Sequence, residues 1–192
     1  MTCLETRLQH NAAFIVALCV LAVFSLSGCR NLPDDPPSTV STVHLDRYLG
    51  QWYEIASFPA WFQEGCVGST AEYRLRKDGD IDVINRCRDG SLTGKERSAE
   101  GIARLDPSKP DGSRLLVSFV PLIEGWYWIL ALDNDYHWSL VGTPDRRRLW
   151  ILSRTPTLQP AVFDAVVAKA AALGFDVLQL QKTLQQSPPQ NP

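Results

Sequence analysis

Short segments of alternating polar and apolar residues, separated by turn-forming residues, recur through most of the chain and constrain its fold more than any other feature. We identify eight strand segments, at residues 50–56, 71–76, 81–87, 95–105, 114–120, 125–132, 136–141 and 150–156. The segment 125–132 does not alternate but is apolar throughout, so we expect both of its faces to be covered. Short, regularly spaced strands of this kind are typical of an all-β barrel or sandwich. Because the connections are short, we predict an antiparallel up-and-down meander of eight strands that closes into a barrel and leaves no exposed edge.

One amphipathic helix is expected after the last strand. Pro160 suits the first helical position, and Gly174 suits the position just past the end. Apolar residues recur between them at helical spacing, namely Val162, Phe163, Val166, Val167, Ala170 and Leu173. This stripe needs an apolar surface to cover, so we predict that the helix packs on the outside of the barrel.

The first residues resemble a bacterial lipoprotein signal peptide. An apolar run is shorter than the membrane span of about 20 residues and ends in Leu-Ser-Gly-Cys, with the cysteine at Cys29. This matches the lipobox, so we expect residues 1–28 to be removed and Cys29 to be lipidated, because several acyl chains give stable anchoring. The alternative is a plain secretory signal with a chance cysteine. Arg30 follows, not Asp, and by resemblance to bacterial lipoproteins this favours the outer membrane, on its periplasmic side.

The remaining chain divides into a tether, a domain and a tail. Residues 29–43 are rich in proline and polar residues, so we expect the lipidated cysteine to be followed by a flexible tether. Residues 44–183 hold all the predicted strands and the helix. Residues 184–192, rich in Pro and Gln, are predicted to be disordered.

Two cysteines belong to the predicted domain. Cys66 leads into one strand and Cys87 ends its hairpin partner, so pairing about the turn at Asp78-Gly79 brings them close. An exported protein permits oxidation, and we predict a disulfide. The alternative is two buried thiols.

A tryptophan and an arginine, far apart in sequence, mark one end of the predicted barrel. Trp52 follows Gly50 at the start of the first strand, and Arg154 ends the last. An arginine stacked on the tryptophan face could close that end through a cation–π contact. On the residues alone, an ordinary core tryptophan and an unrelated surface arginine are equally open.

Three motifs together resemble those of the lipocalins. Gly50-Gln51-Trp52 resembles their GxW motif, and Trp150 to Arg154 resembles their third motif, whose arginine packs over that tryptophan. Residues 133–136 resemble their second motif imperfectly, because Leu132 replaces the usual threonine. With the lipobox, the chain is similar to bacterial outer-membrane lipocalins of the apolipoprotein-D-like group. This resemblance implies an eight-stranded calyx that binds fatty acids or lysophospholipids and can form homodimers.

Strand alternation predicts which residues line such a cavity. The expected lining is Tyr73, Leu75, Ile81, Val83, Leu115, Val117, Phe119, Trp128, Leu130, Trp138 and Leu140. A shift of one residue in any strand would invert that strand's contribution.

Other classes of function find less support in the sequence. There is no basic stripe with interleaved aromatic residues, so nucleic acid is not an expected partner. An enzyme is the weaker alternative, because the predicted domain offers only His44 and His137, without a nucleophile elbow or a metal-ligand cluster, and we expect no cofactor or metal. A scaffolding lipoprotein that docks a partner through Trp61 and Phe62 is the third alternative. Arg146-Arg147-Arg148 is either a solvated turn or a contact for anionic headgroups.

Overall fold

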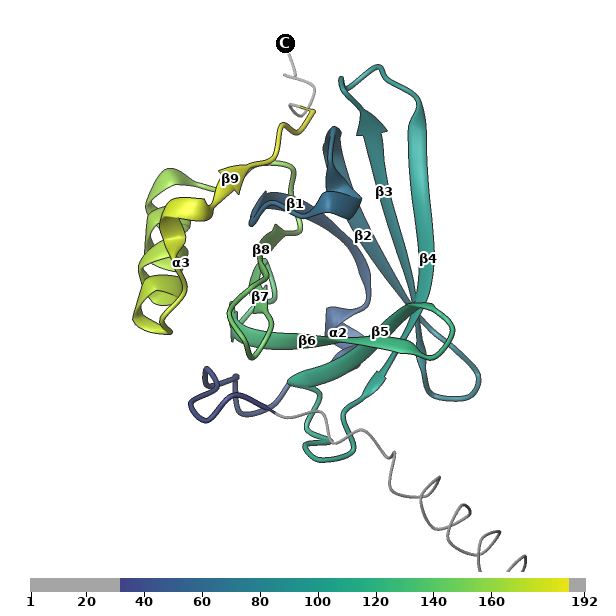
Figure 1. Ribbon diagram of the computed structural model, residues 1–192, viewed down its shortest axis with the longest axis vertical. Coiled ribbons are helices and arrows are strands. Elements are labelled where there is room, and N and C mark those ends of the chain that lie inside the picture. The colour runs from purple at the N-terminus through teal and green to yellow at the C-terminus, as the bar shows by residue number, and fades with distance from the viewer. Residues whose placement is uncertain (1–31, 187–192) are drawn as a thin grey trace, which may run out of the picture. The chain divides into compact units, whose positions relative to one another are not determined.

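The computed structural model describes residues 32–186, and these form a closed antiparallel barrel with a helix on its outside (Figure 1). Cys29 and the signal segment lie outside the described residues. The barrel strands are β1 (Gly50–Ser57), β2 (Cys66–Leu75), β3 (Ile81–Asp89), β4 (Glu96–Leu105), β5 (Arg114–Val120), β6 (Ile123–Leu132), β7 (Trp138–Gly142) and β8 (Leu149–Ser153). The other elements are α2 (Leu45–Tyr48), η1 (Trp61–Gln63), α3 (Pro160–Ala172), η2 (Val177–Gln179) and β9 (Gln181–Lys182). The predicted eight-stranded meander and its single C-terminal helix are confirmed.

β1 closes the barrel by pairing with the first and last strands of the meander. Gly50–Tyr53 pairs with β2, and Tyr53–Ser57 pairs with β8 across a bulge. The pairing of β1 with β2 ends at Tyr53. Further along β1, Ala56 and Ser57 pair with β9 on the edge that β2 leaves free. The prediction of a disordered tail is wrong at its start, because Leu184 O accepts a hydrogen bond from the Gly68 N–H and Gln185 Nε2 donates to Glu54 O and Ser69 O.

The connections divide between two ends of the barrel. Those after β1, β3, β5 and β7 share one end, which we call the mouth. Hydrogen bonds join two of them, from Arg97 Nη1 to Glu64 O at 2.8 Å and from the Gly90 N–H to Gly65 O at 2.7 Å. Those after β2, β4 and β6 share the opposite end with α2, which we call the closed end.

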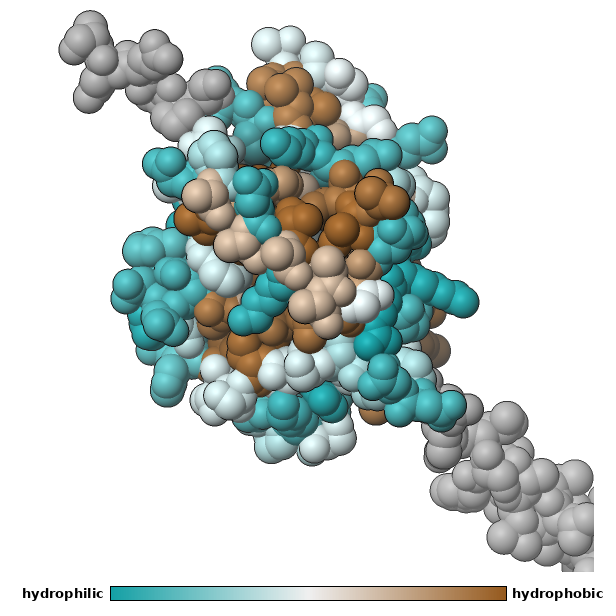
Figure 2. Space-filling model, turned by 90° about the vertical axis from the view of Figure 1, so that its left-hand side faces the viewer, coloured by the Kyte–Doolittle hydropathy of each residue, from teal (hydrophilic) through white to brown (hydrophobic). Residues whose placement is uncertain are grey.

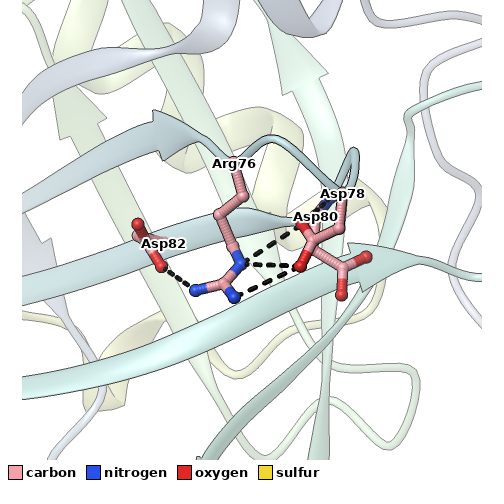
Figure 3. Close-up of polar contacts among 4 residues, drawn as sticks. All are labelled: Arg76, Asp78, Asp80 and Asp82. Carbon is pink, nitrogen blue, oxygen red and sulfur yellow. Dashed lines mark hydrogen bonds and ion pairs between the residues drawn. The ribbon is translucent and has the colours of Figure 1, made fainter.

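The β2–β3 hairpin at the closed end is held by charged side chains (Figure 3). Arg76 donates to Asp82 Oδ1 at 2.7 Å and to both carboxylate oxygens of Asp78 at 3.2 Å. Asp78 Oδ1 also accepts from the Asp80 N–H, which fixes the tight turn.

Two apolar clusters lie on the two sides of the barrel wall. The inner cluster lies inside the barrel and includes Trp52, Tyr73, Ile129 and Val141. The outer cluster lies between the wall and α3, whose Val166 and Ala170 are buried. Figure 2, which views the side that carries α3, shows apolar residues gathered across this face.

The predicted cavity lining is wrong for β6 and β7. Trp128, Leu130 and Leu140 belong to the outer cluster, and Trp138 packs against it. The inward positions are Tyr127, Ile129, Ser139 and Val141, because each faces a member of the inner wall across the register. Both faces of these strands are buried, one inside the barrel and the other beneath α3. The pattern of apolar and polar residues therefore could not indicate which face points inward.

The segment before the barrel is not a free tether over its described part. The Val40 N–H donates to Ile129 O at 3.0 Å, and the Val43 N–H donates to Asp111 O at 2.9 Å. Val43 is buried in the inner cluster, and Asp35 O accepts from Arg146 Nη1. The flexible-tether prediction is therefore wrong for residues 35–43.

Candidate functional site

The inner wall carries the remaining predicted lining residues in three different settings. Tyr73, Ile81, Val83 and Leu115 are buried in the inner cluster, and Val117 packs against it. Leu75 is 61% exposed beside the closed-end hairpin, and Phe119 is 43% exposed near the mouth. Contact with a ligand stays a prediction for all of them.

Part of the inner wall is not filled by side chains. Ala71, Val117, Tyr127 and Trp150 pack against the inner cluster, yet each keeps partial solvent exposure. Each stands opposite an inner residue across the register, as Tyr127 does to Leu115 and Trp150 to Val141. These side chains point inward and remain partly accessible to solvent, so side chains do not completely fill this part of the interior.

Four hydroxyl groups meet inside the barrel and form what we call the hydroxyl chain. The Tyr127 oxygen lies 2.8 Å from those of Tyr73 and Tyr48, and the Tyr48 oxygen lies 3.1 Å from Ser139 Oγ. The four side chains come from β2, β6, α2 and β7, so the chain joins separate parts of the wall. It is a polar layer that crosses the apolar inner cluster.

The hydroxyl chain has one hydrogen too many for its own contacts. Four hydroxyls supply four hydrogens, and the three contacts within the chain use three. One hydroxyl of the four therefore keeps a hydrogen that no other member of the chain accepts, and the direction of the three contacts decides which one. An unpaired buried donor costs about 1–3 kcal/mol, so the chain is suited to a ligand oxygen or a water.

Burial keeps the three phenols protonated. It raises the pKa of Tyr48 to about 12, against weaker opposing effects of hydrogen bonds to Ser139 and Tyr127 and of the Arg154 charge. Burial also raises the pKa of Tyr73 and of Tyr127. Tyr48 adds to the shift of Tyr73, which the hydrogen bond to Tyr127 opposes, and both Tyr48 and Tyr73 add to the shift of Tyr127. The chain therefore presents hydrogen-bond donors at any physiological pH.

The closed end is held by the predicted pair. Arg154 Cζ lies 3.8 Å from the centroid of the Trp52 ring, and Trp52 Nε1 donates to Tyr48 O at 2.8 Å. Arg154 also donates to Gln51 O at 2.9 Å and to Arg47 O at 2.7 Å. Burial lowers the pKa of this guanidinium. The arrangement fixes α2, and with it Tyr48, beneath the interior.

Gly50 suits this position through its backbone. Its φ is +90°, in the left-handed region that favours glycine, whereas a Cβ there would make only ordinary contact with Arg154 Nη1, at 3.5 Å. The first motif therefore combines a backbone requirement with the ring on which Arg154 stacks.

The disulfide predicted from the sequence is present. Cys66 and Cys87 are bonded, with their Cα atoms 5.4 Å apart. The bond joins the mouth end of β2 to the end of β3, next to the mouth connections.

Sequence reasoning missed three members of the hydroxyl chain. Tyr127 and Ser139 lie one residue from the predicted Trp128 and Trp138. Assigning the other set of alternate residues in β6 and β7 to the interior would have found both. Tyr48 lies on a four-residue helix, too short for a periodic pattern to indicate which way it points.

The two histidines of the predicted domain are both exposed, His137 with 73% of its side chain accessible. Potential ligand atoms of Asp133, Asp135 and His137 lie within 4.8 Å of one another. Asp133 Oδ2 already accepts from the backbone N–H of Asp135 and of His137, so this grouping is explained by the turn it closes. In the described part of the chain we find no histidine in the interior.

Comparison with known proteins agrees with this geometry. A family model described as a lipocalin-like domain matches residues 43–185. The chain belongs to the lipocalin family. This lipocalin is 37% identical to the outer membrane lipoprotein Blc of Vibrio cholerae over 92% of the chain and 99% of that protein. It is 40% identical to temperature-induced lipocalin-1 of Arabidopsis thaliana over 78% of the chain and 83% of that protein.

A solved structure supports the same fold. Insecticyanin from the tobacco hornworm Manduca sexta superposes with a TM-score of 0.64, at 21% identity, over 82% of this chain and 87% of that one. Among residues 32–186, no helix is both long and apolar enough to span a membrane.

Proposed function

We propose that this lipocalin is a lipid-binding lipoprotein of the bacterial outer membrane that holds a fatty acid or a lysophospholipid inside its barrel. The observation that carries the proposal is the inward-facing but partly exposed wall of Val117, Tyr127 and Trp150 beside the hydroxyl chain. An acyl chain in such a space gains about 0.8 kcal/mol for each CH₂ removed from water. The role would be transport, storage or repair of envelope lipids.

The proposed location rests on two arguments. The Leu-Ser-Gly-Cys motif supports lipidation of Cys29, and similarity to a protein named outer membrane lipoprotein supports the membrane. Membrane labelling with a radioactive fatty acid, compared between the native chain and Cys29→Ser, tests the anchor. A homodimer is a further expectation, which light scattering of the purified protein measures directly.

A matched pair of tryptophans tests the interior site. Trp150 points into the barrel, whereas Trp138 packs on the outer cluster, and both are partly buried on neighbouring strands. We expect Trp150→Leu to weaken binding of oleate or lysophospholipid roughly tenfold or more, equivalent to about 1.4 kcal/mol. Trp138→Leu should leave affinity unchanged while lowering stability. Equal losses in both variants would argue against binding inside the barrel.

A further inference from the structure

The mouth concentrates exposed apolar side chains. Leu122, in the β5–β6 connection, is 102% exposed and has a φ of +69°. It is flanked by Val120 at 54% and Ile123 at 66%. In the β1–β2 connection, Trp61 is 82% exposed and lies edge-on to Phe62. Burial of such side chains in an apolar phase is favourable, so their shared position at one end of the barrel indicates an interaction surface.

Cationic side chains lie beside these apolar ones. Arg147 has 84% of its side chain exposed, and its one ion pair with a residue in the range 32–186 is a contact of 3.8 Å with Asp145. Arg148 lies 5.8 Å from the Phe62 ring and donates to Pro59 O, which brings the β7–β8 connection against the β1–β2 connection. The mouth therefore combines tryptophan, aliphatic and arginine side chains, a composition typical of surfaces that lie at a membrane interface.

The charges of the barrel differ between its two ends. The four mouth connections hold Lys95, Arg146, Arg147 and Arg148 against Glu64 and Asp145, and Asp35 pairs with Arg146, which leaves an excess of one positive charge. The three closed-end connections hold Arg76, Lys77 and Lys109 against Asp78, Asp80, Asp106, Asp111, Asp133 and Asp135. With Asp46, Arg47 and Arg154 counted, the closed end keeps an excess of two negative charges.

We infer that the mouth is a docking surface for an anionic phospholipid bilayer. An anionic bilayer attracts the mouth and repels the closed end, so the field orients the barrel before contact. Trp61, Phe62 and Leu122 then enter the interfacial region while Arg147 and Arg148 contact headgroup phosphates. This inference does not depend on which ligand the interior holds.

The test uses the chain from Arg30 onwards, because lipidated Cys29 would bring any variant to any vesicle. Both apolar clusters and every strand lie within residues 32–186, so this chain contains the whole barrel. Sedimentation with vesicles of phosphatidylglycerol and phosphatidylethanolamine measures binding, with phosphatidylcholine vesicles as the neutral comparison. We expect binding to the anionic vesicles that weakens as salt rises above about 0.1 M, where the Debye length falls below about 10 Å.

A matched pair of leucines distinguishes vesicle binding through the mouth from non-specific hydrophobic binding. Leu122→Ser should weaken vesicle binding roughly tenfold. Leu75→Ser removes another largely exposed leucine, 61% accessible but at the closed end, and should have no effect. Arg147→Gln should weaken binding about fivefold. Arg74→Gln, on a side chain 56% exposed on the barrel wall, should not.

Trp61 supplies a second measurement. Bromine-labelled phospholipids should quench part of the tryptophan fluorescence, and Trp61→Phe should abolish that quenching. Absence of binding to anionic vesicles by the native sequence would overturn the inference. Equal losses in Leu122→Ser and Leu75→Ser would also overturn it, as would equal binding to neutral and anionic vesicles.

Discussion

Tyr127 and Trp128 are neighbours in β6 and lie on opposite sides of the barrel wall. The Tyr127 hydroxyl is hydrogen-bonded to both Tyr48 and Tyr73 inside, whereas Trp128 is fully buried in the outer cluster beneath α3. One strand thus supplies both the polar layer of the interior and the apolar seat of the helix.

Removal of the central hydroxyl should destabilise the protein. Tyr127→Phe leaves Tyr73 without its only hydroxyl partner and deprives Tyr48 of one of two. We expect a loss of about 1–3 kcal/mol in the free energy of unfolding, measured by urea denaturation. Tyr53→Phe serves as the control, because the structure gives the Tyr53 hydroxyl no hydrogen bond. Equal effects of the two substitutions would show that the hydroxyl chain contributes nothing.

Alkaline pH should destabilise the fold, because a buried tyrosine loses its proton at a higher pH in the folded chain than in the unfolded chain. Burial raises the pKa of Tyr48 to about 12, above the value near 10 of an unfolded chain. Between these values the unfolded chain releases the proton that the folded chain keeps, so stability is complete below about pH 10 and falls as pH rises towards 12. The slope is about 1.4 kcal/mol per pH unit for one such tyrosine. Denaturation at a series of pH values measures it, and stability that stays constant through this range would contradict the buried assignment.

Arg154 should not be replaceable by lysine. The guanidinium stacks on Trp52 and donates to four backbone carbonyls, those of Gln51, Arg47, Tyr48 and Tyr136. A lysine cannot reproduce this planar fork, so Arg154→Lys should cost about 2–4 kcal/mol in the free energy of unfolding. Arg74→Lys, at an exposed ion pair with Glu72, should cost less than about 1 kcal/mol. A small effect at Arg154 would mean that the closed end is held by the rest of the core.

Reduction of the disulfide should weaken the mouth end. Cys66 and Cys87 are 21 residues apart, and closing a loop of that size contributes about 3 kcal/mol in the chain-entropy account. The double variant Cys66→Ser/Cys87→Ser should lose this amount relative to the oxidised protein. Native protein denatured with reductant should match the double variant. A reductant effect that persists in that variant would point to another cause.

The sequence could predict which side chains of a strand point into the barrel where the other face of that strand meets water. In β2 and β3, Tyr73 and Val83 alternate with Glu72, Arg74 and Asp82, and the structure places the apolar set inside. In β6 and β7, α3 covers the outer face, both faces are apolar, and the prediction was wrong for Trp128 and Leu140. The covering helix is distant in sequence, so no local pattern could reveal which side it would take.

Pairings between distant residues were predictable only where a motif marked them. The Trp52–Arg154 stack and the Cys66–Cys87 bond were expected and are present. The hydrogen bonds between residues 35–43 and the barrel were not expected. A proline-rich composition indicates an extended chain, but it does not indicate which groups of the barrel that chain will contact. The hydroxyl chain was missed for a similar reason, since its members are separated by up to 91 residues.

Native mass spectrometry with lipid extraction, on the chain from Arg30 expressed without its anchor, measures whether the barrel holds a lipid. We expect the protein to carry a fatty acid or a lysophospholipid at close to one molecule per barrel, and Trp150→Leu, but not Trp138→Leu, to lose most of it. A protein that is isolated empty, and that also fails to bind added oleate or lysophospholipid, would contradict the claim that the interior is a lipid-binding site.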